Sequence, residues 1–149
     1  MTVSLDGFRE MATAEKGLVE VSMLRADGTI VASVVTAGVM QNPGKNSDDD
    51  LVVFVARGVR KLEHLRANPN VTVVVRSGWR WAAVEGTAIL IGPDDPHVGV
   101  DEEGLRLLLR DVFTAAGGTH EDWDEYDRVM RDERSAAVFI TPTRTYPAS

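Results

Sequence analysis

Apolar and polar residues alternate along this chain with the periods of short strands and short helices. Leu5, Phe8 and Met11 recur at helical spacing, whereas most later segments are β-branched runs between turn formers. A loop at 41–50, rich in Pro, Gly, Asn and Asp, separates the second strand from the third. The predicted elements are a helix at 6–14, strands at 18–25, 29–40 and 51–56, a helix at 59–67, strands at 71–76 and 81–91, helices at 101–116 and 119–131, and a strand at 135–141 that Pro142 ends.

Tight turns join two pairs of these strands. Ala26-Asp27-Gly28 connects the first pair, and Gly78 lies in the turn of the second pair. Strands joined by tight turns are antiparallel, so the pattern predicts an antiparallel sheet rather than a doubly wound one. Gly86, inside a predicted strand, indicates a bulge or a close approach of backbone or ligand. Thr119 is the predicted N-cap of the last helix, with Asp122 as its capping-box partner.

Two predicted strands are apolar or β-branched on both faces, LVVFVA at 51–56 and VTVVV at 71–75. An antiparallel sheet with one wet face would alternate apolar and polar residues instead. A closed barrel would cover one face of these strands, and a helix or a second subunit must cover the other. We therefore predict a mainly β, α+β fold, one domain over residues 1–149, and a homodimer.

Composition restricts the chemistry of the protein. The 149 residues have the size of one domain, and 44% of them are hydrophobic, as in ordinary globular proteins. The lack of cysteine excludes a disulfide framework, thiolate catalysis and cysteine-bound zinc. The first residues do not have the pattern of a signal peptide, and no apolar stretch is long enough to span a bilayer. We expect a cytoplasmic protein with no membrane partner.

The net charge of −7 is unevenly distributed. Positions 57–80 hold six basic residues and one acid, whereas positions 92–133 hold thirteen acids and four basic residues. A local basic cluster on an acidic protein suits a small anion such as a phosphate, and nucleic acid more often binds a basic domain. Arginines that coat exposed strands and helices would give the same pattern. The six residues are Arg57, Arg60, Lys61, Arg66, Arg76 and Arg80.

The sequence contains no self-contained catalytic or metal site. His64, His97 and His120 are dispersed, without the spacing of metal ligands, and the acidic run at 48–50 is typical of a solvated loop. No serine lies in a G-x-S-x-G setting, and no phosphate-binding glycine loop opens a helix after a strand. We predict no catalytic side chain and no metal, so any redox chemistry belongs to a bound cofactor.

The strongest candidate for ligand binding lies between residues 51 and 75. An apolar strand leads into Arg57-Gly58-Val59-Arg60-Lys61, where the predicted helix at 59–67 begins. Free N–H groups, the helix dipole and three cations would converge at this junction, which favours an anion. The alternative is an ordinary helix start with surface arginines.

The same segment resembles a known family. A strand, a basic turn, a short helix ending in L-R-x-N-P and a β-branched strand are similar to the pyridoxamine-5′-phosphate-oxidase-like split β-barrels. Four further segments resemble the actinobacterial deazaflavin-dependent branch, and the resemblance covers about 15–146. They are the R-A-D-G turn followed by Ala32 to Val35, residues 78–88 (GWRWAAVEGTA), residues 119–126 (THEDWDEY) and residues 130–134 (MRDER).

The resemblance implies an antiparallel split β-barrel of the FMN-binding type with flanking helices. It also implies a homodimer with two cofactor sites at its interface. The cofactor implied is coenzyme F420, an 8-hydroxy-5-deazaflavin, or FMN in other branches. Lys61 matches a family lysine that contacts the cofactor, while Val59 stands where close relatives carry an arginine. The predicted cofactor-binding residues are Ser33, Val34, Val35, Thr36, Arg57, Val59, Arg60, Lys61 and Trp79.

The function implied is that of an F420H2-dependent oxidoreductase, which transfers a hydride from the reduced deazaflavin to an unsaturated organic substrate. One alternative is an FMN-dependent enzyme of the pyridoxamine-5′-phosphate oxidase type, and another is a non-catalytic cofactor carrier. Trp79 and Trp81 also fit aromatic residues of a barrel or an interface. Residues 120–126 are interpreted as a helix cap packed on the barrel rather than as a ligand site.

Overall fold

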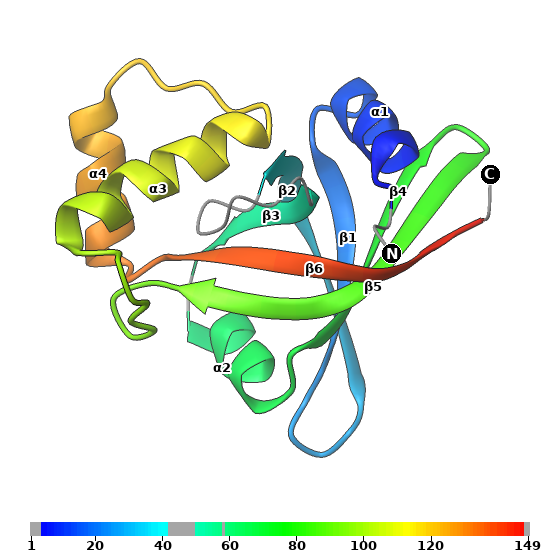
Figure 1. Cartoon of the computed structure of the whole chain (residues 1–149), viewed down its shortest axis with the longest axis horizontal. Helices are drawn as coiled ribbons and strands as arrows, with labels where there is room; N and C mark the ends of the chain where they lie inside the picture. Colours follow the sequence, from blue (N-terminus) through cyan, green and yellow to red (C-terminus); the bar gives the residue numbers. More distant parts are fainter. Residues whose placement is uncertain (1–3, 42–49, 58, 148–149) are drawn as a thin grey trace.

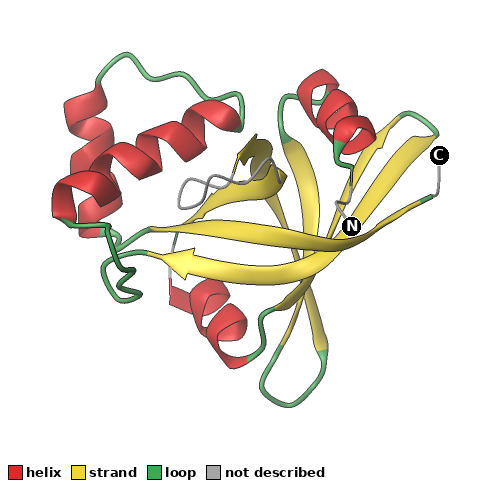
Figure 2. Ribbon diagram, viewed as in Figure 1, coloured by secondary structure: helices red, strands yellow, loops and turns green. Residues whose placement is uncertain are grey.

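The computed structural model describes residues 4–41, 50–57 and 59–147, in which the strands form a closed antiparallel barrel in the order β1-β2-β3-β6-β5-β4. Figures 1 and 2 show α1 and α2 on opposite sides of the barrel, with α3 and α4 together beside it. The predicted mainly β, α+β architecture is confirmed. The elements are α1 (Asp6–Ala14), β1 (Leu18–Leu24), β2 (Ile30–Gln41), β3 (Asp50–Ala56), α2 (Val59–Ala67), β4 (Asn70–Ser77), β5 (Arg80–Ile91), α3 (Glu102–Ala115), α4 (Trp123–Asp132) and β6 (Ala136–Tyr146).

The barrel interior is filled by apolar side chains that alternate along each strand. On β3, Val52, Phe54 and Ala56 point into this core. The two helices on opposite sides of the barrel add their apolar faces to the same core, α1 through Phe8 and α2 through Leu62. Complete burial of such a side chain contributes roughly 1.5–3 kcal/mol, so this core dominates the stability of the barrel.

A second core lies on the outer face of β3 and β6, beneath α3 and α4. Leu51 and Val53, which alternate with the inward residues of β3, pack there with Val112 of α3 and Tyr126 of α4. The Tyr126 hydroxyl donates a hydrogen bond to the Leu109 carbonyl at 2.9 Å, and burial raises the pKa of Tyr126 to about 12. Helices of the same chain therefore provide the cover that the sequence requires for the second face of β3.

The predicted end of the last strand is wrong, because β6 continues through Pro142 to Tyr146. A β-bulge accommodates the proline: the pairing passes from Gly86–Pro142 to Glu85–Arg144 and leaves Thr143 as the extra residue. Gly86 has the predicted close approach, since a Cβ there would lie 2.2 Å from the Thr141 carbonyl oxygen. The predicted loop at 41–50 falls largely on residues 42–49, which lie outside the described residues.

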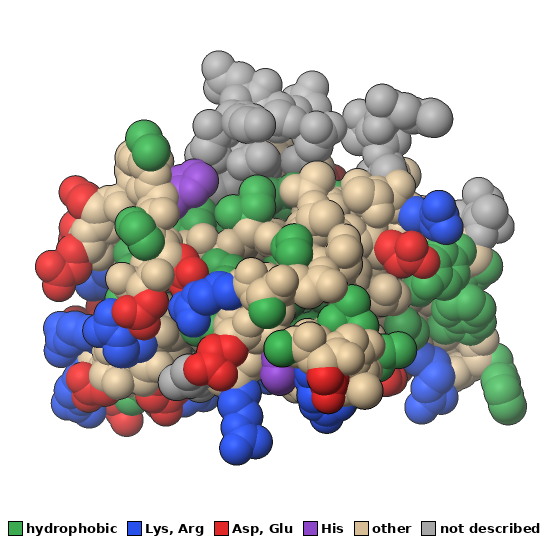
Figure 3. Space-filling view, turned by 90° about the horizontal axis from the view of Figure 1, so that it is seen from below, with side chains coloured by type: hydrophobic (Ala, Val, Ile, Leu, Met, Phe, Trp, Pro, Cys, Tyr) green, Lys and Arg blue, Asp and Glu red, His purple; other side chains and the backbone are tan. Residues whose placement is uncertain are grey.

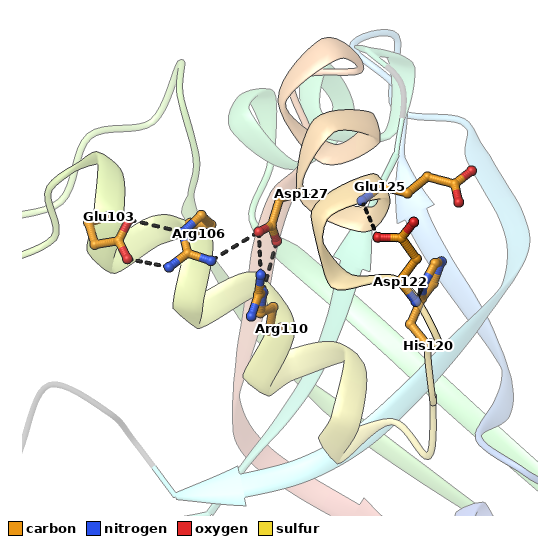
Figure 4. A network of polar contacts seen from close by, with 7 residues as sticks. All are labelled: Glu103, Arg106, Arg110, His120, Asp122, Glu125 and Asp127. Carbon is orange, nitrogen blue, oxygen red and sulfur yellow. Dashed lines mark hydrogen bonds and ion pairs between the residues drawn. The ribbon is translucent and has the colours of Figure 1, made fainter.

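The predicted cap of the last helix is also wrong. Helix α4 begins at Trp123, so Thr119 lies before it, and Asp122 is the N-cap rather than the capping-box partner. The Asp122 carboxylate accepts a hydrogen bond from the Glu125 N–H at 3.1 Å, while His120 Nδ1 accepts one from the Asp122 N–H at 3.0 Å (Figure 4). The interpretation of this segment as a helix cap therefore agrees with the structure.

Candidate functional site

Strand β2 changes its neighbour along its length and leaves a free backbone edge. Residues 30–36 pair with β1, whereas residues 37–41 pair with β3. The Ala37 N–H donates to the Gly17 carbonyl at 2.8 Å, on the β1 side. Because backbone groups alternate in direction along an antiparallel strand, those of Ala32 and Val34 point to the other side, where pairing with β3 has ended. Within the described residues these groups have no backbone partner, so they can hydrogen-bond a ligand laid along the strand.

The predicted site residues of β2 divide between two faces. Val35 and Ser33 lie on the side of the barrel interior, and Val34 and Thr36 are exposed on the outside. Within the described residues, the Ser33 Oγ is buried and has no hydrogen-bond partner. An unsatisfied buried hydroxyl costs roughly 1–3 kcal/mol, so Ser33 is a local cost to the stability of β2.

The end of β3 lies beside the free edge of β2. Ala37 pairs with Phe54, so the same antiparallel register, continued, places Ala56 beside Val35. The chain leaves β3 immediately after Ala56 and enters α2. The start of α2 therefore follows directly after the residue of β3 that the continued register places beside the free edge of β2.

The predicted cations at the start of α2 differ in whether they form an ion pair. Arg57 donates to Glu133 through Nε at 2.9 Å, and this hydrogen bond raises the pKa of Arg57. Arg60 is exposed and Lys61 is half-buried, and neither has an ion-pair partner in the part of the chain that the structure describes. Val59 begins the helix, and its side chain is outside the described atoms. Arg60 and Lys61 are therefore the cations available to an anion.

The other basic residues of positions 57–80 lie apart from this junction. Arg66 forms a salt bridge with Asp95 at 2.5 Å, and Arg80 lies 3.8 Å from Glu10. Arg76 donates to the Gly78 carbonyl at 3.0 Å. On the face seen in Figure 3, Lys and Arg side chains are spread among acidic ones. The basic residues of positions 57–80 therefore do not form one patch. The remaining candidates for binding an anion are those at the start of α2.

Trp79 lies far from the start of α2 within one chain. It is fully exposed at the tip of the β4–β5 hairpin. Strand β4, whose eight residues span roughly 25 Å, lies between this tip and the end of α2. Figure 1 shows the tip and α2 at opposite ends of this strand. Trp81 is partly exposed and meets Tyr146 edge-on, with 6.2 Å between ring centroids. Within one chain, Trp79 and the start of α2 therefore do not form one site.

Apolar side chains also gather on the outer face of β1, β2, β4 and β5. Glu20 of β1 pairs with Val34 on one side and with Val74 on the other, so these residues form one row across the sheet. No described helix packs its apolar face on this row. We call this surface the open sheet face. It comprises Leu18, Ile30, Val34, Val74 and Trp81, and the exposed, charged Glu20 lies between Val34 and Val74.

A cavity of about 860 Å³ lies away from the β2 edge, and sequence reasoning missed it. It is bounded by the segment 92–101, the first half of α3 and the end of α4. We call it the helical cavity. In the sequence, GPDDP at 92–96 is the segment that points to this cavity, because its two prolines favour a loop of fixed shape before α3.

A network of charges holds α3 and α4 together beside the helical cavity (Figure 4). Asp127 accepts hydrogen bonds from Arg110 Nε at 2.9 Å and from Arg106 Nη1 at 3.0 Å. The two guanidinium groups hold the pKa of Asp127 below its usual value, and the hydrogen bond from Arg110 has the larger effect. Arg106 also pairs with Glu103, so the charges of the network compensate one another.

Two further classes of site are absent from the described residues. No group of three or more His, Asp or Glu side chains is placed to hold a metal ion there. None of the helices in this part of the chain has both the length and the apolar character needed to cross a bilayer.

Solved structures share this fold, whereas no family model matches the chain. A candidate 5-nitroimidazole antibiotic resistance protein from Bacteroides thetaiotaomicron matches with a TM-score of 0.64 and 12% identity, over 97% of this chain and 84% of that one. A pyridoxamine 5′-phosphate oxidase-related, FMN-binding protein from Nostoc punctiforme matches with a TM-score of 0.61 and 11% identity, with the same coverages of 97% and 84%.

An F420 reductase also has this fold. It matches with a TM-score of 0.58 and 15% identity, over 87% of this chain and 88% of that one. The structural neighbours are thus split-barrel proteins related to pyridoxamine 5′-phosphate oxidase, and the predicted split β-barrel is confirmed. At these identities the likeness concerns the fold, which is shared by proteins named for different flavin-type cofactors.

Proposed function

We propose that the protein binds coenzyme F420 along the β2 edge and catalyses hydride transfer between the deazaflavin and an unsaturated organic substrate. The observation that carries this proposal is a backbone edge of β2 next to the end of β3, followed in the chain by two cations at a helix N-terminus, all without a partner among the described residues. A deazaflavin has a flat ring with polar edge groups and an anionic tail. These two parts match the two components of the site. The shared fold of an F420 reductase supports the same choice.

The residues of the site would position the cofactor rather than perform chemistry themselves. The backbone groups of Ala32 and Val34 bind the polar edge of the ring. Lys61 and Arg60 bind the phosphate of the tail, helped by the N–H groups at the start of α2. When bound, the reduced deazaflavin supplies the hydride from its C5. Fixing its orientation in a water-poor slot is the contribution of the protein.

Arg57, which is paired with Glu133, could also contact the phosphate of the cofactor. Its salt bridge with Glu133 is partly exposed, and such pairs contribute little net stability, about 0–1 kcal/mol. A phosphate close to Arg57 would therefore compete well with Glu133. The site can gain a third cation without a large loss of stability.

We expect coenzyme F420 to bind more tightly than FMN, because the longer anionic tail makes more contacts with the cations. The affinity should fall as salt rises from low to physiological ionic strength, since partly exposed ion pairs are screened. Parallel fluorescence titrations with the two cofactors measure both effects. FMN binding that equals or exceeds F420 binding would overturn the cofactor assignment. Tight F420 binding without turnover on quinones and enones would indicate a carrier protein.

The proposed site needs a homodimer formed through the open sheet face. Val34 belongs both to this face and to the free edge of β2, so a second copy placed on the face would also wall the cofactor site. Trp79 joins the site only from that second copy. An apolar surface of this kind is typical of interfaces between subunits.

Light scattering should give twice the chain mass of 16.2 kDa at micromolar concentration. Leu18→Lys, which places a charge on the open sheet face, should shift the protein toward monomer. Leu107→Lys is the matched control, because Leu107 is similarly exposed but lies on α3. A wild-type monomer, or a Leu18→Lys variant that remains fully dimeric, contradicts this interface.

A further inference from the structure

One acidic side chain already occupies the cation that directly follows β3. The Arg57 guanidinium donates to Glu133 Oε2 through Nε at 2.9 Å and to Glu133 Oε1 through Nη2 at 3.3 Å. Two parallel N–H donors of a guanidinium bind a phosphate in the same way. The Glu133 carboxylate therefore takes the place that two phosphate oxygens would occupy on Arg57.

The ion pair also holds Arg57 on one side of β3. Ala56, the last residue of β3, pairs with Ala136 of β6, and Glu133 lies in the turn between α4 and β6. Strand β2 pairs with the opposite edge of β3. The hydrogen bonds to Glu133 therefore draw the Arg57 guanidinium toward β6 and away from the free edge of β2.

Glu133 is placed unfavourably with respect to its own helix. It is the C-cap of α4, and the helix dipole favours a cation there, as Arg131 in the last turn provides. The side chains of Arg57 and Glu133 are 58% and 43% exposed, and ion pairs this exposed contribute little to stability. The effect of the carboxylate on Arg57 is therefore a better reason for its position than the stability of the fold.

We propose that Glu133 is a specificity-determining residue of the cofactor site, which acts as an internal competitor for Arg57. A ligand that uses Arg57 must displace the Glu133 carboxylate. A singly charged anion offers Arg57 no more charge than Glu133 does and also loses its freedom of motion on binding. A tail with several negative charges, such as a phosphate followed by carboxylates, can gain this third cation. The inference rests on the proposed binding of coenzyme F420 and adds a residue that the cofactor need not touch.

Glu133→Gln tests the competition, because the amide keeps the shape of the side chain and removes its charge. Coenzyme F420 should bind this variant about twofold to fivefold more tightly than the wild type, the value of one partly exposed ion pair. The same deazaflavin without its phosphate and carboxylates should bind both proteins equally. Fluorescence titrations measure the four affinities. Loss of a merely structural ion pair would leave F420 binding unchanged or weaken it, so a gain identifies the competition.

Two controls show whether the gain acts through Arg57. Asp132→Asn removes one negative charge from the neighbouring exposed position, which forms no ion pair among the described residues, and its F420 affinity should equal that of the wild type. In an Arg57→Gln background, Glu133→Gln should bring no gain, because the cation for which it competes is gone.

The outcomes separate this inference from the proposed function. If the wild type binds F420, unchanged or weaker binding by Glu133→Gln would overturn the inference alone. An equal gain for the deazaflavin without its tail, or for Asp132→Asn, would overturn it too. If neither the wild type nor Glu133→Gln binds F420, the proposed function is wrong and the inference falls with it.

Discussion

Lys61→Ala should weaken the binding of coenzyme F420 about tenfold to a hundredfold while leaving the fold intact. Lys61 is half-buried in the first turn of α2, with no ion-pair partner among the described residues. A charge-assisted hydrogen bond to a phosphate contributes roughly 1.5–3 kcal/mol, and about 1.4 kcal/mol corresponds to a factor of ten. A fluorescence titration of the variant with the cofactor measures the loss.

The free energy of unfolding should change by no more than about 0.5 kcal/mol, as for most surface substitutions. A small gain is expected, because a positive charge at a helix N-terminus opposes the helix dipole. Arg128→Ala is the matched control, since it removes one positive charge from an exposed position of α4. Its cofactor affinity should equal that of the wild type. Wild-type affinity in Lys61→Ala would leave Arg57 and Arg60 as the anion-binding candidates.

Gly38→Ala should destabilise the fold by about 3 kcal/mol, the upper part of the range for overpacking a core. A Cβ at Gly38 would lie 2.0 Å from the carbonyl oxygen of Ala115, at the end of α3. Strand β2 and helix α3 are each held by their own backbone hydrogen bonds, so neither can move aside without losing some of these bonds. Urea denaturation of the variant and the wild type measures the difference.

Gly7→Ala is the control for the glycine prediction. Gly7 lies in α1, and a Cβ there would meet no atom within 4 Å. The substitution should raise the free energy of unfolding by up to about 1 kcal/mol, because alanine favours a helix. If Gly38→Ala were as stable as Gly7→Ala, the close contact between β2 and α3 would not exist in solution.

Much of the fold follows from local patterns in the sequence. Strand β3 contains no polar residue between Leu51 and Ala56, which requires apolar cover on both faces, and the structure provides a core on each side. The bounds of α1 and α2 also agree with prediction, because a single apolar stripe and a following Asn-Pro define them. Local propensity and burial point the same way in these segments.

The errors in the predicted element bounds arise where contacts between residues far apart in the sequence determine where an element begins or ends. Pro142 ends a strand by local rules, but a bulge opposite Gly86 lets β6 continue past it. Asp is a better N-cap than Thr, and α4 begins after Asp122, where Trp123 also meets Phe113 edge-on. No short-range pattern reports these contacts.

The candidate site was only partly predictable for the same reason. The strand, the basic turn and the helix are adjacent in sequence, so the junction at Arg60 and Lys61 could be anticipated. The salt bridge between Arg57 and Glu133 joins residues 76 positions apart and could not. The helical cavity depends on how α3 and α4 pack, which the sequence pattern does not report.

The alternation of β3 and β6 between two cores has a consequence for folding. Phe54 faces the barrel interior while its neighbour Val53 faces α3 and α4, and Val138 and Ala137 do the same on β6. Helices α3 and α4, which form the helical layer, therefore have no core of their own. They cannot unfold without exposing the outer face of β3 and β6. Barrel closure between β3 and β6 joins segments far apart in the chain, which slows folding. The molecule should consequently unfold in a single cooperative transition, with barrel and helical layer lost together.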